Sequence, residues 1–191
     1  MQRLVMGVAG FTFALAGVAA WTTPTALVTA GAGTPVERGR YLVTSIGCSD
    51  CHTPKTMGAN GPEEDHSRLL SGHPEGSNFS APPALGSGPW IATASWDLTA
   101  WAGPWGISYA RNLTPDENTG IGSWSEETFL QTLRTGRHMG VARPILPPMP
   151  WQNFRNLSDE DLKSMYAYLR SIPPVKNRVP QPVEPTAVAS N

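Results

Sequence analysis

One short stretch constrains this 191-residue chain more than any other: Cys48-Ser49-Asp50-Cys51-His52, which holds its only two cysteines. Two cysteines three positions apart, with a histidine directly behind them, occur in disulfides, in zinc sites, in redox motifs and where a prosthetic group is attached covalently. Each alternative asks for different residues elsewhere in the chain, so the rest of the sequence decides between them.

Three of these alternatives find little support. A disulfide between Cys48 and Cys51 would close a very short loop, which stabilises a fold little. A zinc site needs about four ligands, and the chain has no second cysteine pair, while His66 and His73 lie in a stretch that we expect to be flexible. A thioredoxin-like redox motif expects a neighbouring strand–helix–strand pattern, which the sequence does not show.

The remaining interpretation is covalent attachment of haem c, for which C-x-x-C-H is the signature. Two thioether bonds must reach two vinyl groups on one edge of a planar macrocycle, so the two thiols must lie a short, fixed distance apart. The next residue then lies under the iron, where the imidazole of His52 can be the fifth ligand. The motif therefore predicts one haem c attached at Cys48 and Cys51, with His52 on its iron.

The first thirty residues have the pattern of an export signal. Arg3 is the only charge before Glu37, residues 4–20 are apolar, and Val28-Thr29-Ala30 places small residues where a signal peptidase cleaves. The alternative is an uncleaved anchor helix, because an apolar run of 17 residues is at the short end of what spans a bilayer. Both alternatives carry the domain out of the cytoplasm. We predict a signal peptide over residues 1–30 and a periplasmic protein.

Three amphipathic helices are expected after the leader. The first begins near Pro35 and runs into the cysteine motif, although Gly39 weakens it. The second is capped by Ser125 and ended by Gly136. The third is capped by Ser158 and stopped by two prolines.

Between the first and second helices, residues 58–106 are rich in Gly, Pro, Ser and Thr and show no strand alternation. We expect a long loop there, and its four tryptophans, at positions 90, 96, 101 and 105, should pack against an apolar surface. The sequence thus predicts an all-α domain over residues 35–174, with three to five helices and long Pro/Gly-rich loops around one haem. A flexible proline-rich tail should follow over residues 175–191.

The sequence offers several candidates for the sixth ligand, which binds the iron on the face opposite His52. A methionine there raises the reduction potential and favours electron transfer, and the chain after the leader offers Met57, Met139, Met149 and Met165. Met149 lies among prolines in PPMPW, and these leave the thioether few conformations. We expect Met149 to be the sixth ligand. His138 and Met139 are the alternatives, and Met165 fits the core of the last helix better.

Four segments follow one another along the chain: CSDCH, then NLTPDENTGIGSWSEETFLQTLRTG, then PPMPW, then LSDEDLKSMYAYLRSIPP. This order resembles the class I c-type cytochrome domain of bacterial periplasmic cytochromes, notably the cytochrome subunits of membrane-linked alcohol and aldehyde dehydrogenases. The resemblance covers residues 36–174 and implies attachment at Cys48 and Cys51, with His52 and Met149 axial. Such subunits often carry several haems, whereas this chain has one C-x-x-C-H.

These features predict an electron carrier rather than an enzyme. It would pass one electron at a time from a dehydrogenase donor to a respiratory acceptor, either an oxidase or another cytochrome. A net charge of −1 without any basic run gives no nucleic-acid signature. Two alternatives stay open: a haem c protein that is a permanent component of an oxidoreductase complex, and a ligand-binding or peroxidase-like haem protein with His138 beside an open iron.

A polar stretch before the second helix is a further candidate for haem contacts. Arg111, Asn112 and Thr114 include donors that suit the anionic propionates of haem. The alternative is a surface turn, because the order Asn-Leu-Thr-Pro is typical of turns.

Overall fold

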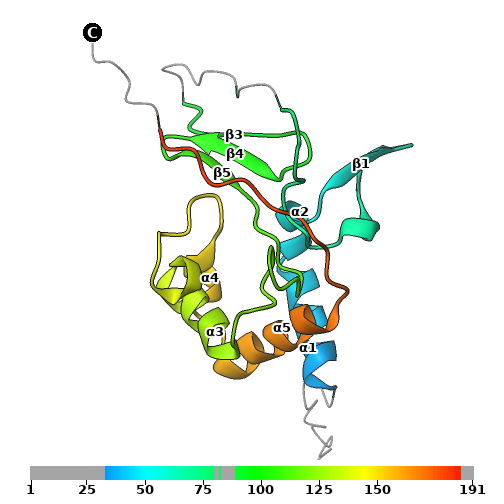
Figure 1. The fold of residues 1–191 in the computed structure, drawn as a ribbon, viewed down its shortest axis with the longest axis vertical. Coiled ribbons are helices and arrows are strands. Elements are labelled where there is room, and N and C mark those ends of the chain that lie inside the picture. The colour runs from blue at the N-terminus through cyan, green and yellow to red at the C-terminus, as the bar shows by residue number, and fades with distance from the viewer. Residues whose placement is uncertain (1–32, 80–81, 83–88, 186–191) are drawn as a thin grey trace, which may run out of the picture. The chain divides into compact units, whose positions relative to one another are not determined.

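The computed structural model describes residues 33–79, residue 82 and residues 89–185. The predicted leader, residues 1–30, lies outside this part of the chain. Among the helices that are described, none combines the length and the apolar character that a membrane crossing needs. The elements of the described residues (Figure 1) are α1 (Pro35–Ser45), α2 (Cys48–His52), β1 (Lys55–Gly58), β2 (Gly61–Glu64), η1 (His66–Arg68), β3 (Thr93–Ala94), β4 (Ala100–Gly103), β5 (Gly106–Tyr109), α3 (Glu126–Thr135), η2 (His138–Gly140), α4 (Trp151–Phe154) and α5 (Asp159–Ser171).

Helices α1 and α5 pack against each other, and Figure 1 shows them crossing. Thr34 caps α1 and Ser158 caps α5, each through its side-chain oxygen. Gly39 of α1 lies against the backbone of Ser164 in α5, where a Cβ atom would collide with the carbonyl group. The glycine that weakens α1 by propensity is therefore the residue that lets the two helices approach closely.

The three predicted helices are confirmed, and they enclose the core. Ser125 caps α3, and Gly136 ends it with a φ of 66°, the left-handed conformation that glycine adopts readily. Buried apolar side chains from these helices and the adjoining loops form one cluster: Leu42, Val43, Leu70, Ile121, Phe129, Leu130, Leu133, Leu162, Met165 and Leu169. Met165 is only 3% exposed, which confirms its predicted place in the core.

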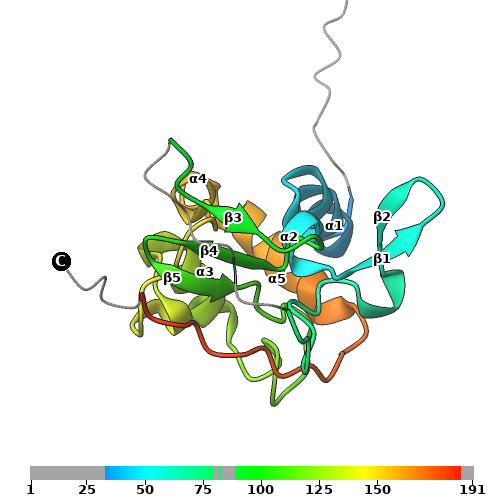
Figure 2. The ribbon, with the colours of Figure 1, turned by 90° about the horizontal axis from the view of Figure 1, so that it is seen from above.

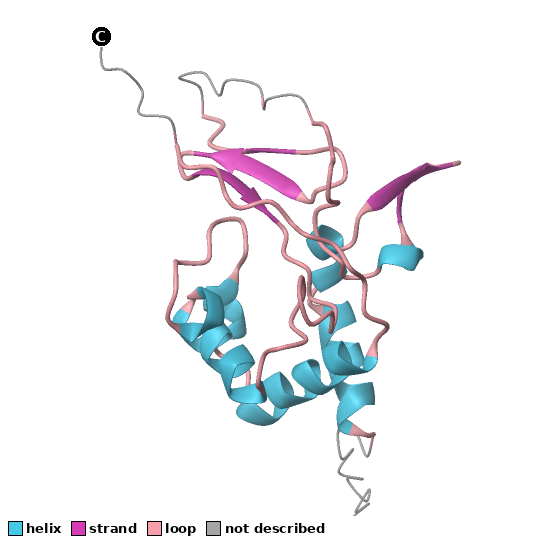
Figure 3. Ribbon diagram, in the orientation of Figure 1, coloured by secondary structure: helices cyan, strands magenta, loops and turns pink. Residues whose placement is uncertain are grey.

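The prediction of an all-α domain is wrong, because the described residues include two small antiparallel sheets (Figure 3). Strands β1 and β2 form a hairpin with Gly58 opposite Gly61, and β4 and β5 form another with Gly103 opposite Gly106. Strand β3 pairs with the other edge of β4. These strands have two to four residues each, too few to establish a period of two. The glycines at the tight turns of the two hairpins are also typical of loops, so they favour a loop prediction.

Residues 175–185, where the sequence predicts a flexible tail, run along the rest of the domain, and we call them the C-terminal strap. Figures 1 and 2 show this orange-to-red segment running back from α5 and ending beside β5. Val179 of the strap is 3% exposed. Val183 and Ile107 exchange two backbone hydrogen bonds of 2.9 Å, which attach the strap to β5. Residues 186–191 lie outside the described part of the chain.

Candidate haem site

One cavity of about 570 Å³ gathers the residues that the sequence singles out. Cys48, Cys51 and His52 line it from α2, and Met149 lines it from the loop before α4. Figure 1 shows α2 and that loop on two sides of the drawing, with the β3–β4–β5 sheet above them. The structure thus places all four predicted site residues around one space.

Both cysteines of α2 are free thiols. The helix follows Gly47, whose φ of 73° is left-handed and costs a glycine little. Burial, and then the charge of Asp50, raise the pKa of Cys48 to about 12. The same two causes raise the pKa of Cys51. The surroundings of both thiols thus favour the protonated form.

The ring of His52 is oriented by one hydrogen bond. Its Nδ1 lies 2.7 Å from the backbone carbonyl oxygen of Arg111, so the Nδ1–H donates and Nε2 keeps its lone pair. Burial lowers the pKa of the imidazole and favours its neutral, metal-binding form. A neutral ring with a free Nε2 and a carbonyl behind it is the arrangement in which proteins commonly hold a metal-ligating histidine.

The loop that carries Met149 is tied to neighbouring elements. Ser108 in β5 donates from its hydroxyl to the carbonyl oxygen of Pro147 at 2.6 Å. The backbone amide of Ile145 donates to the carbonyl oxygen of Gly136 at 2.8 Å. Met149 itself is partly buried against the hydrophobic core. These contacts hold its thioether at the edge of the cavity.

The alternative sixth ligands, His138 and Met139, also line the cavity. Both lie in η2, directly after α3. The side chain of Met139 is 48% exposed, in contrast to the partly buried Met149. The ring of His138 packs edge-on against Trp124, with 5.4 Å between ring centroids. Met149 is therefore the better shielded of the two thioethers.

Two arginines line the cavity as well, Arg111 after β5 and Arg143 in the loop before α4. Burial, and then the charge of Arg143, lower the pKa of Arg111. Burial lowers the pKa of Arg143, and burial followed by the charges of both arginines lowers the pKa of His138. These groups are close enough to repel one another's positive charge, so this side of the cavity favours an anion.

The interpretation of Asn112 and Thr114 as a surface turn is wrong, because they are only 3% and 0% exposed. The side-chain oxygen of Asn112 accepts hydrogen bonds from the amide and the hydroxyl of Thr114, at 2.9 and 2.7 Å. Its amide nitrogen donates to the carbonyl oxygen of Val175 in the strap at 2.8 Å. The two residues therefore fasten the strap, and no local pattern indicates a partner more than sixty positions away.

Sequence reasoning also missed the wall that the sheet gives to the cavity. Trp101 of β4 and Tyr109 of β5 both line it. The expectation that all four tryptophans pack against an apolar surface is wrong for Trp90 and Trp96, which are 78% and 51% exposed. The Gly-x-x-Gly spacing at residues 103–106 is the signal of a two-residue hairpin that could have located this wall.

The residues present fit haem c. The cavity falls within the range of about 300–1,000 Å³ that is usual for ligand and cofactor sites. Two free thiols, an imidazole with a free Nε2 and a shielded thioether are the groups that covalent attachment and a His/Met iron require. The two arginines supply positive charge for carboxylates.

A family model described as cytochrome c matches residues 36–173. The chain belongs to the cytochrome c family. It is 31% identical over 156 residues to the fructose dehydrogenase cytochrome subunit of Gluconobacter japonicus, a match that covers 81% of this chain and 25% of that protein. It is 31% identical over 144 residues to the gluconate 2-dehydrogenase cytochrome c subunit of Pantoea cypripedii, covering 73% and 24%. It is 39% identical over 80 residues to the cytochrome c subunit of the quinone alcohol dehydrogenase of Gluconobacter oxydans, covering 40% and 16%.

Membership in the cytochrome c family means a covalently attached haem c and a role as a haem electron carrier. These three relatives are named as cytochrome subunits of dehydrogenases, and such subunits are electron-transfer components. The chain spans a quarter or less of the length of each of the three relatives.

Proposed function

We propose that this cytochrome c carries one electron at a time, in the periplasm, between a dehydrogenase donor and a respiratory acceptor. The observation that carries the proposal is the convergence of Cys48, Cys51, His52 and Met149 on one cavity. When bound there, haem c supplies an iron that cycles between the ferrous and ferric states. The apolar leader, with small residues at its end, supports export.

Each residue of the site has one task in this proposal. Cys48 and Cys51 hold the porphyrin edge through thioether bonds. His52 binds the iron through Nε2, kept free by the hydrogen bond from Nδ1. Met149 would offer its thioether to the iron from a loop tied to β5 and to Gly136, the residue that ends α3. With haem bound, His52 and Met149 would both be held in place by the protein, and electron transfer would need no substrate bond to form or break. The single C-x-x-C-H supports one haem.

Absorption spectra of the purified, haem-loaded protein test the ligand assignment. The oxidised protein should show the weak far-red band of sulfur-ligated ferric haem, and Met149→Ala should abolish it. Met139→Ala is the matched control, since it removes the neighbouring thioether that is half exposed, and it should leave the band in place. Loss of the band in Met139→Ala alone would assign the ligand to Met139.

Tight binding of carbon monoxide by the untreated reduced protein would support the ligand-binding alternative instead. In that case the iron would have an open face, and His138, which lines the cavity, would be its polar neighbour.

A second candidate function, a permanent subunit of an oxidoreductase complex, is favoured by one observation. Residues 76–110 contain a single charged side chain, Asp97, and it is buried. Trp90 and Ile91 in the same stretch are 78% and 71% exposed. An uncharged surface with exposed aromatic groups suits a lasting apolar interface better than a charge-steered encounter. Copurification with a dehydrogenase in gentle detergent should then withstand high salt, whereas a transient carrier would elute alone.

A further inference from the structure

Two cavity arginines have no carboxylate partner among the described residues. The ion pairs of this part of the chain involve Arg38, Lys55, Arg68 and Arg134, and neither Arg111 nor Arg143. Arg143 donates one hydrogen bond, to the carbonyl oxygen of Pro144 at 3.2 Å. A guanidinium has five N–H donors, so most of the donors of both arginines are left for a ligand. Two partly buried positive charges on one wall call for an anion.

The strap holds Arg111 in that position. The Nη1 atom of Arg111 donates to the carbonyl oxygens of Val179 and Pro180 in the strap, at 3.3 and 3.0 Å. The backbone carbonyl of the same arginine accepts the hydrogen bond from Nδ1 of His52. Arg111 therefore connects the strap to the histidine of the motif.

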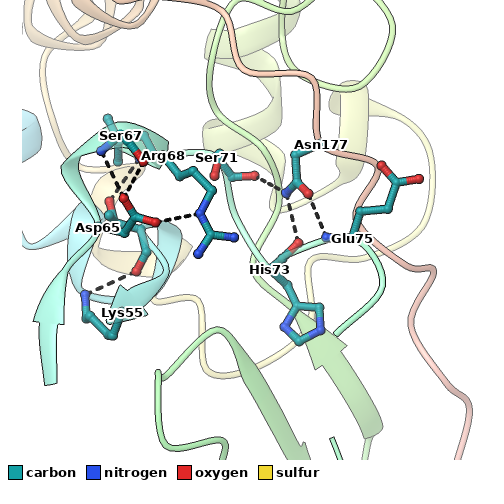
Figure 4. Close-up of polar contacts among 10 residues, drawn as sticks. Lys55, Asp65, Ser67, Arg68, Ser71, His73, Glu75 and Asn177 are labelled. Atoms are coloured by element: carbon teal, nitrogen blue, oxygen red, sulfur yellow. Dashed lines mark hydrogen bonds and ion pairs between the residues drawn. The ribbon is translucent and has the colours of Figure 1, made fainter. Parts of the chain in front are cut away.

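The strap is in turn fastened by Asn177, which is 7% exposed. Figure 4 shows its side chain between the residues that follow η1. The amide nitrogen donates to the carbonyl oxygens of Ser71 and His73, at 2.7 and 2.9 Å, and the amide oxygen accepts from the backbone of Glu75 at 2.7 Å. The asparagine side chain uses its hydrogen-bonding groups on one loop, so its removal should loosen the strap near residue 177.

We propose that the C-terminal strap is part of the haem site: it holds Arg111 in the cavity, where Arg111 and Arg143 bind the carboxylate groups of the haem. The inference rests on the proposed function, because it needs haem c at Cys48 and Cys51. It also goes beyond the family match, since residues 175–185 lie outside the matched residues 36–173. Arginine suits the role because its planar guanidinium binds a carboxylate through two parallel hydrogen bonds.

The charge of the two arginines gives the proposal a measurable consequence. Positive charge near the iron disfavours the ferric state, and it also offsets the negative charge of the haem carboxylates. Replacing either arginine by a neutral residue should therefore stabilise the ferric state and lower the reduction potential. If the two arginines served packing alone, their replacement would lower the stability of the protein and leave its reduction potential unchanged.

The test compares reduction potentials of haem-loaded proteins. Arg111→Gln and Arg143→Gln should each change the ferric-to-ferrous ratio at a fixed potential by about tenfold, or about 59 mV for a one-electron couple. Arg143→Lys should retain most of the parent potential because it keeps the charge. Arg137→Gln is the matched control, since Arg137 is exposed, its side chain donates to the carbonyl of Ala142, and it does not line the cavity. It should behave as the parent.

Asn177→Ala tests whether the strap contributes to the haem site. It keeps both arginines and should still lower the potential, because Arg111 loses its support. Unchanged potentials in Arg111→Gln and Arg143→Gln would overturn the carboxylate site, and an unchanged potential in Asn177→Ala would overturn the role of the strap. Failure of the proposed function is recognised separately, in the parent protein, by the absence of covalently bound haem or of the sulfur-ligated spectrum.

Discussion

Two parts of this molecule are held together by different forces. The helical part, α1, α3 and α5, is joined by a cluster of buried apolar side chains. The part made of the β3–β4–β5 sheet and the strap is joined largely by buried polar side chains such as Asn112, Asn177 and His73. Both parts contribute walls to the same cavity. Apolar burial tolerates approximate geometry, whereas a buried polar group needs a specific partner, so the second part is the more sensitive to chemical detail.

The largest effect should come from a cavity in the helical part. Leu162 in α5 is fully buried, and Leu162→Ala should lower the free energy of unfolding of the haem-loaded protein by about 2–5 kcal/mol. Lys163→Ala replaces the exposed next residue and should change it by no more than about 0.5 kcal/mol. Denaturant titration measures both. Equal losses in the two variants would show that apolar packing does not hold this part together.

An intermediate effect is expected from the polar part. Asn112→Ala removes the bonds to Thr114 and Val175 and leaves buried groups without partners, which should cost about 1–3 kcal/mol. Limited proteolysis should then cut within the strap faster than in the parent. Asn156→Ala is the control, because its side chain is exposed and donates a single bond to Gln152. A strap that stays protected in Asn112→Ala would contradict its attachment through this residue.

The smallest effect should be a dependence on pH through His73. Its Nδ1 lies 2.8 Å from the hydroxyl oxygen of Thr99, which donates in turn to Asp97, and its ring packs against Phe79 and Tyr109. Burial lowers the pKa of this imidazole, although the charge of Asp97 opposes the shift. The folded state then binds the proton less readily than the unfolded state.

The stability that His73 contributes is thus complete above the ordinary pKa of about 6.5 and is lost as the pH falls through that value toward the lower pKa of the folded state. Denaturant titrations at pH 7.5 and pH 5 should show a smaller difference for His73→Gln than for the parent. An identical difference would mean that this histidine does not titrate differently on folding.

The difference between the helical part and the part made of the sheet and the strap also explains which features could be predicted from the sequence. The caps Ser125 and Ser158, the stop at Gly136 and the C-x-x-C-H motif are local signals, and each lies where the sequence predicts it. The hairpin at residues 103–106 reads as loop because its strands are too short to alternate. The strap reads as a loose tail because Asn177 depends on Ser71, 106 positions earlier. Sequence patterns report neighbours along the chain and say little about such distant partners.

The long separation between Asn177 and its partners has a consequence for how the protein is made. A contact that spans 106 residues can form only after residue 177 has been synthesised, and closing so large a loop delays it further. The hydrogen bonds within α3 and within the β4–β5 hairpin are local and do not depend on residue 177. Residues 175–185 would then close around Arg111 as a late step of folding.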